Sequence, residues 1–261
     1  MKFCSLYSGS SGNSMFIASD NARILIDAGL PGKHIEKALT DIGELPNAID
    51  AIFITHEHVD HVKGVGVLSR KYSIPIYANK PTWDGMASTI GKIKEENIRI
   101  IDNNTISIKD MDIVPYNISH DAAMPYGYGV YNGNKKVCVA TDLGYFSEEV
   151  KKNISDADVI LLESNHDVEM LKFGPYPYVL KRRILSNIGH LSNEDCGKAI
   201  VDIVGSKPKN IILGHLSKTN NHPDLAYETV VSVLNANGVK LNEDVKVSMA
   251  KRDIPSNYIE F

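Results

Sequence analysis

The most chemically informative segment of the chain is residues 56–61, which read HEHVDH. His56 and His58 alternate, so an extended chain points both side chains to one side. Asp60 and His61 follow where the chain can turn and present a second group of ligands. Imidazole nitrogen together with carboxylate oxygen suits zinc, manganese or iron(II). The segment therefore predicts a metal centre, and the alternative is a solvated loop that happens to hold several histidines.

Three more residues of metal-binding type each follow a strand-like run. His120 follows DIVPYNIS, Asp142 follows VCVAT, and His215 follows NIILG. Taken singly, each is a weak signal, because a lone His or Asp after a strand is more often a turn or cap residue. If the strands run together, however, their ends converge on one site. With residues 56–61 they would then supply enough ligands for two metals that share a water molecule.

Short apolar runs rich in β-branched residues predict the strands that must position these side chains. They lie at residues 23–27, 51–55, 136–140, 158–163, 210–214 and 245–249. Helices are predicted between them, over residues 31–43, over about 176–187, from Ser192 onward and after Pro223. No repeat or linker-like stretch interrupts the chain, so residues 1–261 are predicted to form one α/β domain.

The composition is that of an ordinary globular protein, with a net charge of -4. This charge implies no global attraction to nucleic acid or membrane, although a local basic groove would not show in the total. No signal-peptide or transmembrane-length apolar run is present. The three cysteines, Cys4, Cys138 and Cys196, are odd in number and widely spaced, so we expect buried thiols in a reducing cytoplasm.

The HEHVDH motif, followed by separate His, Asp and His residues, resembles the metallo-β-lactamase fold superfamily. The resemblance implies a four-layer αββα sandwich with a binuclear metal site at the sheet edges. It implies that His56, His58 and His120 hold one metal, that Asp60, His61 and His215 hold the second, and that Asp142 bridges them. All seven positions are filled, which argues against a non-catalytic member.

Narrower segments are similar to the YycJ (WalJ) family within that superfamily. They are SGSSGNS (8–14), SHDAAMPYGY (119–128), LESNHD (162–167), GPYPYVLKRRILSNIGHLSN (174–193) and LGHLSKTNN (213–221). This similarity implies a cytoplasmic 5′→3′ DNA exonuclease that uses two divalent metal ions, zinc or manganese, with iron possible. The long insertion of β-CASP nucleases and the flexible arm of tRNA-end-processing members are absent from the sequence.

Several further residues have both a functional and a structural interpretation. His190 is a candidate proton donor or phosphate ligand, or else a polar residue that leads into the Ser192 helix cap. Asn165 and His166 are candidate substrate contacts, and Glu163 is a candidate hydrogen-bond partner for a ligand imidazole. The basic residues Lys181, Arg182 and Arg183 form either a solvated helix face or a grip on a nucleic-acid backbone. Four tyrosines are expected mainly to pack, although tyrosine also stacks on unpaired bases: Tyr126, Tyr128, Tyr176 and Tyr178.

The predicted reaction is hydrolysis through a metal-bridging hydroxide, with Asp60 orienting the nucleophile. Either His190 or a metal-bound water is expected to protonate the leaving oxygen. DNA is the expected substrate, with no membrane and no obligate protein partner. One alternative is a small-molecule hydrolase that acts on a cyclic phosphodiester, lactone or thioester. Another is a regulatory protein that uses the site as a metal-dependent sensor, which the complete ligand set disfavours.

Overall fold

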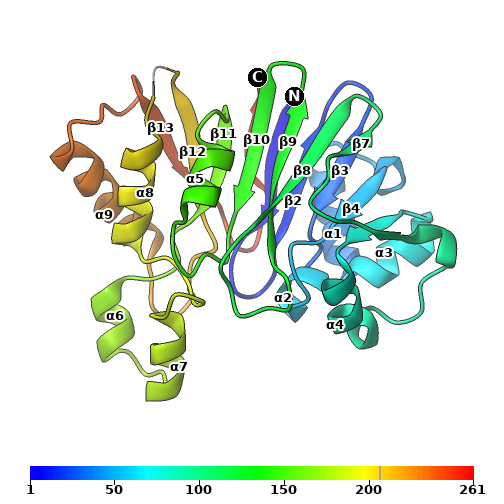
Figure 1. Cartoon of the computed structure of the whole chain (residues 1–261), viewed down its shortest axis with the longest axis horizontal. Coiled ribbons are helices and arrows are strands. Elements are labelled where there is room, and N and C mark those ends of the chain that lie inside the picture. The colour runs from blue at the N-terminus through cyan, green and yellow to red at the C-terminus, as the bar shows by residue number, and fades with distance from the viewer. Residues whose placement is uncertain (206) are drawn as a thin grey trace.

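Two seven-stranded β-sheets pack face to face in the computed structural model, which describes residues 1–205 and 207–261 (Figure 1). The strands of the first sheet run in the order β14 (Ser256–Glu260), β1 (Lys2–Tyr7), β2 (Ser14–Ala18), β3 (Arg23–Ile26), β4 (Ala51–Phe53), β5 (Ile76–Ala78) and β6 (Ile98–Ile100). Those of the second run in the order β13 (Val245–Met249), β12 (Lys209–Gly214), β11 (Val159–Glu163), β10 (Lys135–Ala140), β9 (Tyr126–Asn132), β8 (Met111–Asn117) and β7 (Ile106–Ile108).

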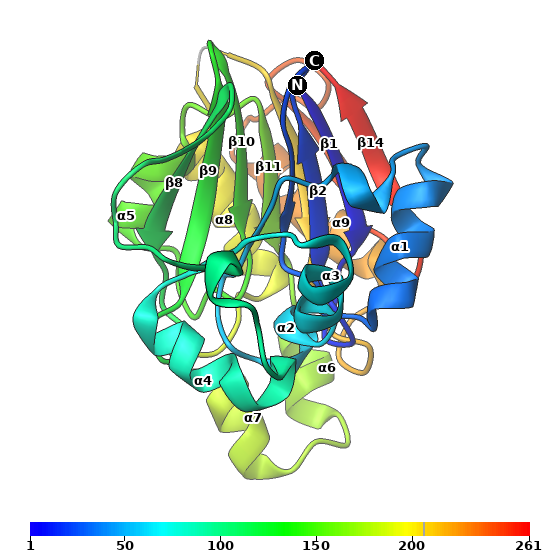
Figure 2. The same ribbon diagram turned by 90° about the vertical axis from the view of Figure 1, so that its right-hand side faces the viewer.

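Helices cover the outer face of each sheet (Figures 1 and 2). The first sheet packs against α1 (Gly32–Asp41), α2 (Val59–Val62), α3 (Val65–Tyr72) and α4 (Lys80–Ile90). The second packs against α5 (Glu148–Ile154), α8 (Asn193–Ile203) and α9 (Pro223–Ala236). Two further short helices, α6 (Val168–Phe173) and α7 (Tyr178–Ile184), project beyond the sandwich. The predicted four-layer αββα architecture is confirmed.

The strands are apolar on both faces because each sheet lies between a second sheet and a layer of helices. In β11, Val159 and Leu161 point into the core between the sheets, whereas Ile160 and Leu162 point to the helices. Phe53 of β4 stacks on Tyr77 at 4.7 Å and meets the edge of Tyr128 of β9 at 5.6 Å. We infer from this shared core that the chain forms one domain.

The six predicted strands are confirmed, as are the helices near residues 31–43, after Ser192 and after Pro223. The helix expected over about 176–187 is shorter, because α7 covers only Tyr178–Ile184. Pro177 keeps the preceding residue out of a helical conformation. At the other end, the backbone N–H of His190 donates to the carbonyl of Ile184 and turns the chain away.

Three smaller expectations also have clear outcomes. The cysteines are free and buried, as predicted. Tyr126 and Tyr128 are fully buried, but the packing prediction for Tyr178 is wrong, since its side chain is 73% exposed at the start of α7. No described helix has the length and apolar character that a membrane span requires.

Candidate metal centre

The candidate ligands lie where strands end along one edge of the sandwich. In the second sheet, β10, β11 and β12 are parallel, and β8 runs in the same direction because β9 is antiparallel to both β8 and β10. Their carboxyl ends therefore meet, and His120, Asp142 and His215 follow three of them. From the first sheet, the turn between β4 and α2 contributes residues 56–61.

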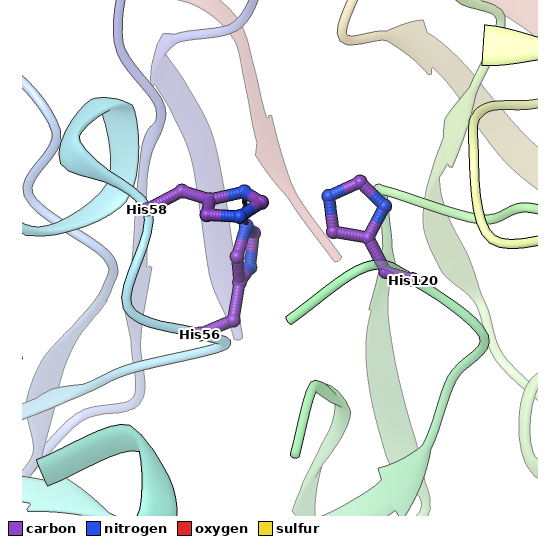
Figure 3. A group of neighbouring side chains, drawn as sticks. All are labelled: His56, His58 and His120. Carbon is purple, nitrogen blue, oxygen red and sulfur yellow. Dashed lines mark hydrogen bonds between the residues drawn. The ribbon is translucent and has the colours of Figure 1, made fainter. Parts of the chain in front are cut away.

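A first cluster contains His56, His58 and His120, whose nearest ring nitrogens all lie within 4.8 Å of one another. His56 Nε2 and His58 Nδ1 are 3.0 Å apart, and the ring of His120 faces them from the other side (Figure 3). His120 Nδ1 donates to the carbonyl of Gly189 at 3.1 Å, which leaves Nε2 available to the cluster. These three imidazoles form one face of a nitrogen-rich metal site.

A second cluster contains Asp60, His61 and His215. Asp60 Oδ2 lies 3.6 Å from His61 Nε2 and 3.9 Å from His215 Nε2. Asp142 lies between the two clusters. Its Oδ2 is 3.3 Å from His61 Nε2, and its Oδ1 is 3.7 Å from His120 Nε2. All seven residues predicted as metal ligands are thus brought together at one place.

The chemistry of this donor set fits divalent cations. His215 Nε2 is buried and has no hydrogen-bond partner among the described residues, which is costly unless another group occupies the space it faces. Five imidazoles and two carboxylates are the ligands that zinc, manganese or iron(II) accepts. The residues present therefore fit a metal centre.

The protonation of two rings gives a further reason to expect a cation. Burial disfavours a charged ring at His61, but the carboxylates of Asp27, Asp142 and Asp60 outweigh it and raise its pKa to about 9. Burial has the same effect at His215, where Asp142 and other carboxylates also prevail and raise the pKa well above its ordinary value. The surrounding carboxylates therefore favour positive charge at both rings, which is the charge that a bound cation would supply.

Asp27 holds His61 in place and was missed by the sequence analysis. Its Oδ2 accepts from His61 Nδ1 at 2.8 Å and from the Thr55 hydroxyl at 2.8 Å, while Oδ1 accepts from the Thr55 backbone N–H at 2.9 Å. The side chain is fully buried. The available signal was its position directly after a strand, which it shares with the other site residues.

Asn13 was also missed. Its Nδ2 lies 3.1 Å from His61 Nε2 and 3.4 Å from Asp60 Oδ2. Asn13 belongs to the GSSGN loop between β1 and β2, so this loop reaches the second cluster.

Glu163, at the end of β11, orients two histidines at once. Its Oε1 lies 2.8 Å from His190 Nδ1 and 2.8 Å from His215 Nδ1. Its Oε2 accepts from the backbone N–H groups of Leu143 and Leu191. Burial disfavours the charged carboxylate, but His190 and His215 hold its pKa well below the usual range. The His190 ring lies between His120 and His215, at centroid distances of 5.1 and 5.3 Å.

The other candidate substrate contacts occupy different environments. Asn165 Nδ2 donates to the carbonyl of His215 at 2.9 Å, so this side chain steadies the loop after β12. His166 is 1% exposed, and neither ring nitrogen has a hydrogen-bond partner among residues 1–205 and 207–261. It lines a cavity of about 390 Å³ together with His190 and Ser192.

Two of the three basic side chains on α7 already have polar partners within the protein. Arg183 forms an ion pair with Asp121. Lys181 Nζ donates to the carbonyl of Lys172 at 2.8 Å. The guanidinium of Arg182 lies over the Tyr178 ring, 5.9 Å from its centre, and faces solvent.

Comparisons with known proteins agree with this geometry. A family model described as the beta-lactamase superfamily domain matches residues 22–216, a span that includes every candidate ligand. The exodeoxyribonuclease YycJ of Bacillus anthracis is 42% identical over 258 residues, which cover 98% of this chain and 97% of the relative. The exodeoxyribonuclease WalJ of Streptococcus pneumoniae is 43% identical over 249 residues, which cover 94% of this chain and 93% of the relative.

Solved structures share the fold at much lower identity. The metallo-beta-lactamase fold protein YhfI from Bacillus subtilis superposes with a TM-score of 0.72 at 14% identity, covering 98% of this chain and 100% of YhfI. The short form of human tRNase Z superposes with a TM-score of 0.66 at 16% identity, covering 100% of both chains. At these identities the likeness bears on the fold alone.

Proposed function

Since the chain belongs to the beta-lactamase superfamily, and within it to the family of the YycJ and WalJ exodeoxyribonucleases, we propose that it is a metal-dependent DNA exonuclease with 5′→3′ polarity. The observation that carries the proposal is the pair of ligand clusters on either side of Asp142. Such a pair is what hydrolysis of a phosphodiester by two metals requires.

We assign His56, His58 and His120 to one metal, and Asp60, His61 and His215 to the other, with the Asp142 carboxylate shared. Zinc and manganese are the proposed ions, and iron(II) is compatible with the same ligands. When bound, the metals supply an activated water nucleophile and offset the negative charge that develops on the phosphate.

The protein side chains then orient the reaction. Asp60, which is partly exposed, accepts a hydrogen bond from the attacking water and fixes its direction. His190 protonates the leaving oxygen through Nε2, because its Nδ1 is held by Glu163. Asn165 and His166 contact the nucleotide next to the scissile bond, and both residues line cavities that include His190. The three buried free cysteines support a reducing cytoplasm as the place of action.

The test is incubation of the purified protein with single- and double-stranded DNA, labelled at one end or the other, in manganese and in zinc. We expect stepwise release of nucleotides from the 5′ end. Asp142→Ala should release both metals and abolish cleavage, because one carboxylate is shared between them. Wild-type metal content in Asp142→Ala would remove Asp142 from the site. Absence of DNA cleavage with manganese, zinc or iron(II), together with hydrolysis of a cyclic phosphodiester, would favour a small-molecule hydrolase.

A further inference from the structure

The pair of helices α6 and α7, together with the loop that joins them, extends beyond the edge of the sandwich (Figures 1 and 2). We call residues 168–184 the projection. Each of its helices buries a single side chain, Leu171 in α6 and Ile184 in α7. Most of the projection is therefore presented to solvent rather than packed on the core.

Large apolar side chains are exposed on this projection. Phe173 is 83% exposed, Val179 is 79% exposed and Tyr178 is 73% exposed. Large exposed apolar side chains that gather on one short segment commonly mark a binding surface. No packing role within the described chain accounts for these three side chains.

The projection carries more positive than negative charge, with four basic residues against the single acidic residue Glu169. From Met170 to Asn193 the sequence contains no Asp or Glu, whereas it contains Lys172, Lys181, Arg182 and Arg183, in a chain of net charge -4. Lys172 and Arg183 pair with acidic residues. Arg182 makes no ion pair within the described residues, and its guanidinium lies over the Tyr178 ring. An anionic partner is therefore favoured at Arg182.

The projection borders a cavity that reaches His190, whose ring lies next to the candidate ligands His120 and His215. A cavity of about 170 Å³ is lined on the projection side by Tyr176 and Leu180. On the side of the metal centre it is lined by Asn165 and His190. A strand lying on the projection would thus approach His190 without crossing the core.

We propose that the projection binds the unpaired end of a DNA strand, with Phe173 and Tyr178 stacking on bases and Arg182 contacting a phosphate. This inference rests on the proposed exonuclease function. A duplex presents charged phosphates and sugars along its sides, and its base faces are covered by neighbouring base pairs. Unpaired bases instead expose flat apolar faces next to phosphates, which matches exposed aromatic and apolar side chains beside a free cation.

The test compares a blunt duplex with a duplex that carries a single-stranded 5′ extension. Both are made with phosphorothioate linkages so that the metal-loaded protein does not degrade them, and Kd is measured by fluorescence anisotropy. The double variant Phe173→Ala/Tyr178→Ala should bind the extended DNA about tenfold or more weakly, and the blunt duplex with little change. The control Leu45→Ala/Ile254→Ala removes two other exposed apolar side chains, 65% and 53% exposed, and should bind as wild type does.

The outcomes separate this inference from the proposed function. A wild type that cleaves DNA, with a double variant that binds both DNAs normally, overturns the inference alone. A wild type that cleaves no DNA overturns the proposed function and the inference with it. If the double variant instead loses binding to anionic phospholipid vesicles and keeps its DNA affinity, the surface binds membrane and the inference is wrong. Unchanged Tm of the double variant shows that its fold is intact.

Discussion

At the scale of single residues, buried carboxylates fix the histidines of the metal centre. Asp27 holds Nδ1 of His61, and Glu163 holds Nδ1 of both His190 and His215. In each case the hydrogen bond to Nδ1 leaves Nε2 as the nitrogen that faces the site. Such partners orient ligand rings and strengthen their binding to a metal.

Replacing Glu163 should therefore affect metal binding and catalysis together. The Glu163 carboxylate accepts hydrogen bonds from four donors through its two oxygens. Glu163→Gln keeps the shape of the side chain but has only one oxygen that can accept. We expect metal affinity or kcat to fall about 10–100-fold. Metal content after dialysis and kcat on DNA measure the effect, with Glu148→Gln, at an exposed position of α5, as the control. Unaltered metal affinity and kcat would mean that Glu163 only stabilises the fold.

At the scale of elements, the strand ends place the site residues through unusual turns. Asp27, Asp142 and His215 have positive φ values of 61°, 60° and 55°, although none of them is a glycine. The left-handed conformation costs about 1–2 kcal/mol for each such residue. Residues in this strained conformation follow the ends of β3, β10 and β12, and such residues are typical of functional sites, where the surrounding structure maintains the strain.

The loop after β3 packs so closely on α2 that one methyl group should disturb the site. A Cβ added at Gly29 would lie 1.6 Å from the carbonyl oxygen of Asp60. We expect Gly29→Ala to displace the turn that carries Asp60 and His61 and to lower the free energy of unfolding by about 1–3 kcal/mol. Metal content and urea unfolding measure both effects.

The matched control for this variant is Gly205→Ala, because a Cβ there meets no atom of residues 1–203 or 207–261 within 4 Å. The control should keep wild-type metal content and stability. If Gly29→Ala also kept full metal content and activity, the turn that carries Asp60 and His61 would accommodate the added methyl group, and the prediction would be wrong.

At the scale of the whole molecule, one core joins both sheets to the site. The Tyr128 hydroxyl in the second sheet donates to the carbonyl of Ile54 at 2.7 Å, two residues before His56. The rings of Phe53, Tyr77 and Tyr128 pack around this point. The position of residues 56–61 against the second sheet therefore depends on how the sheets pack.

The stability of the whole molecule should depend on the neutral state of His166. Burial lowers its pKa to about 4, although the nearby carboxylates of Glu163, Asp195 and Asp167 favour the charged ring and His190 disfavours it. The unfolded chain, with an ordinary pKa near 6.5, binds the proton more readily. The contribution of neutral His166 to the free energy of unfolding is thus fully present above about pH 6.5 and is lost as the pH falls toward 4.

When the pH falls from 7 to 5, the free energy of unfolding of the wild type should decrease by roughly 2 kcal/mol more than that of His166→Gln. Urea unfolding of both proteins at the two pH values measures the difference. Other acid-sensitive groups are common to both proteins and cancel. Equal losses in wild type and His166→Gln would show that His166 does not titrate in this range.

The sequence by itself determined the local features of this protein. Continuous apolar, β-branched runs predict strands that are covered on both faces, and such runs are visible in the local sequence without knowing which strands pair. The spacing of residues 56–61 places four candidate ligands on one short turn, and each later candidate follows a strand. Parallel strand ends meet at one sheet edge, so even the convergence of His120, Asp142 and His215 was predictable.

Only the tertiary structure decided which side chains support that site and which surfaces remain free. The contact between Asp27 and His61 spans 34 residues, and that between Glu163 and His215 spans 52. Such contacts depend on strand register and on how the two sheets pack, which residue type does not specify. For the same reason, sequence did not show that Asp121 engages Arg183 or that Tyr178 is exposed: each outcome depends on where the short helix α7 lies relative to the core.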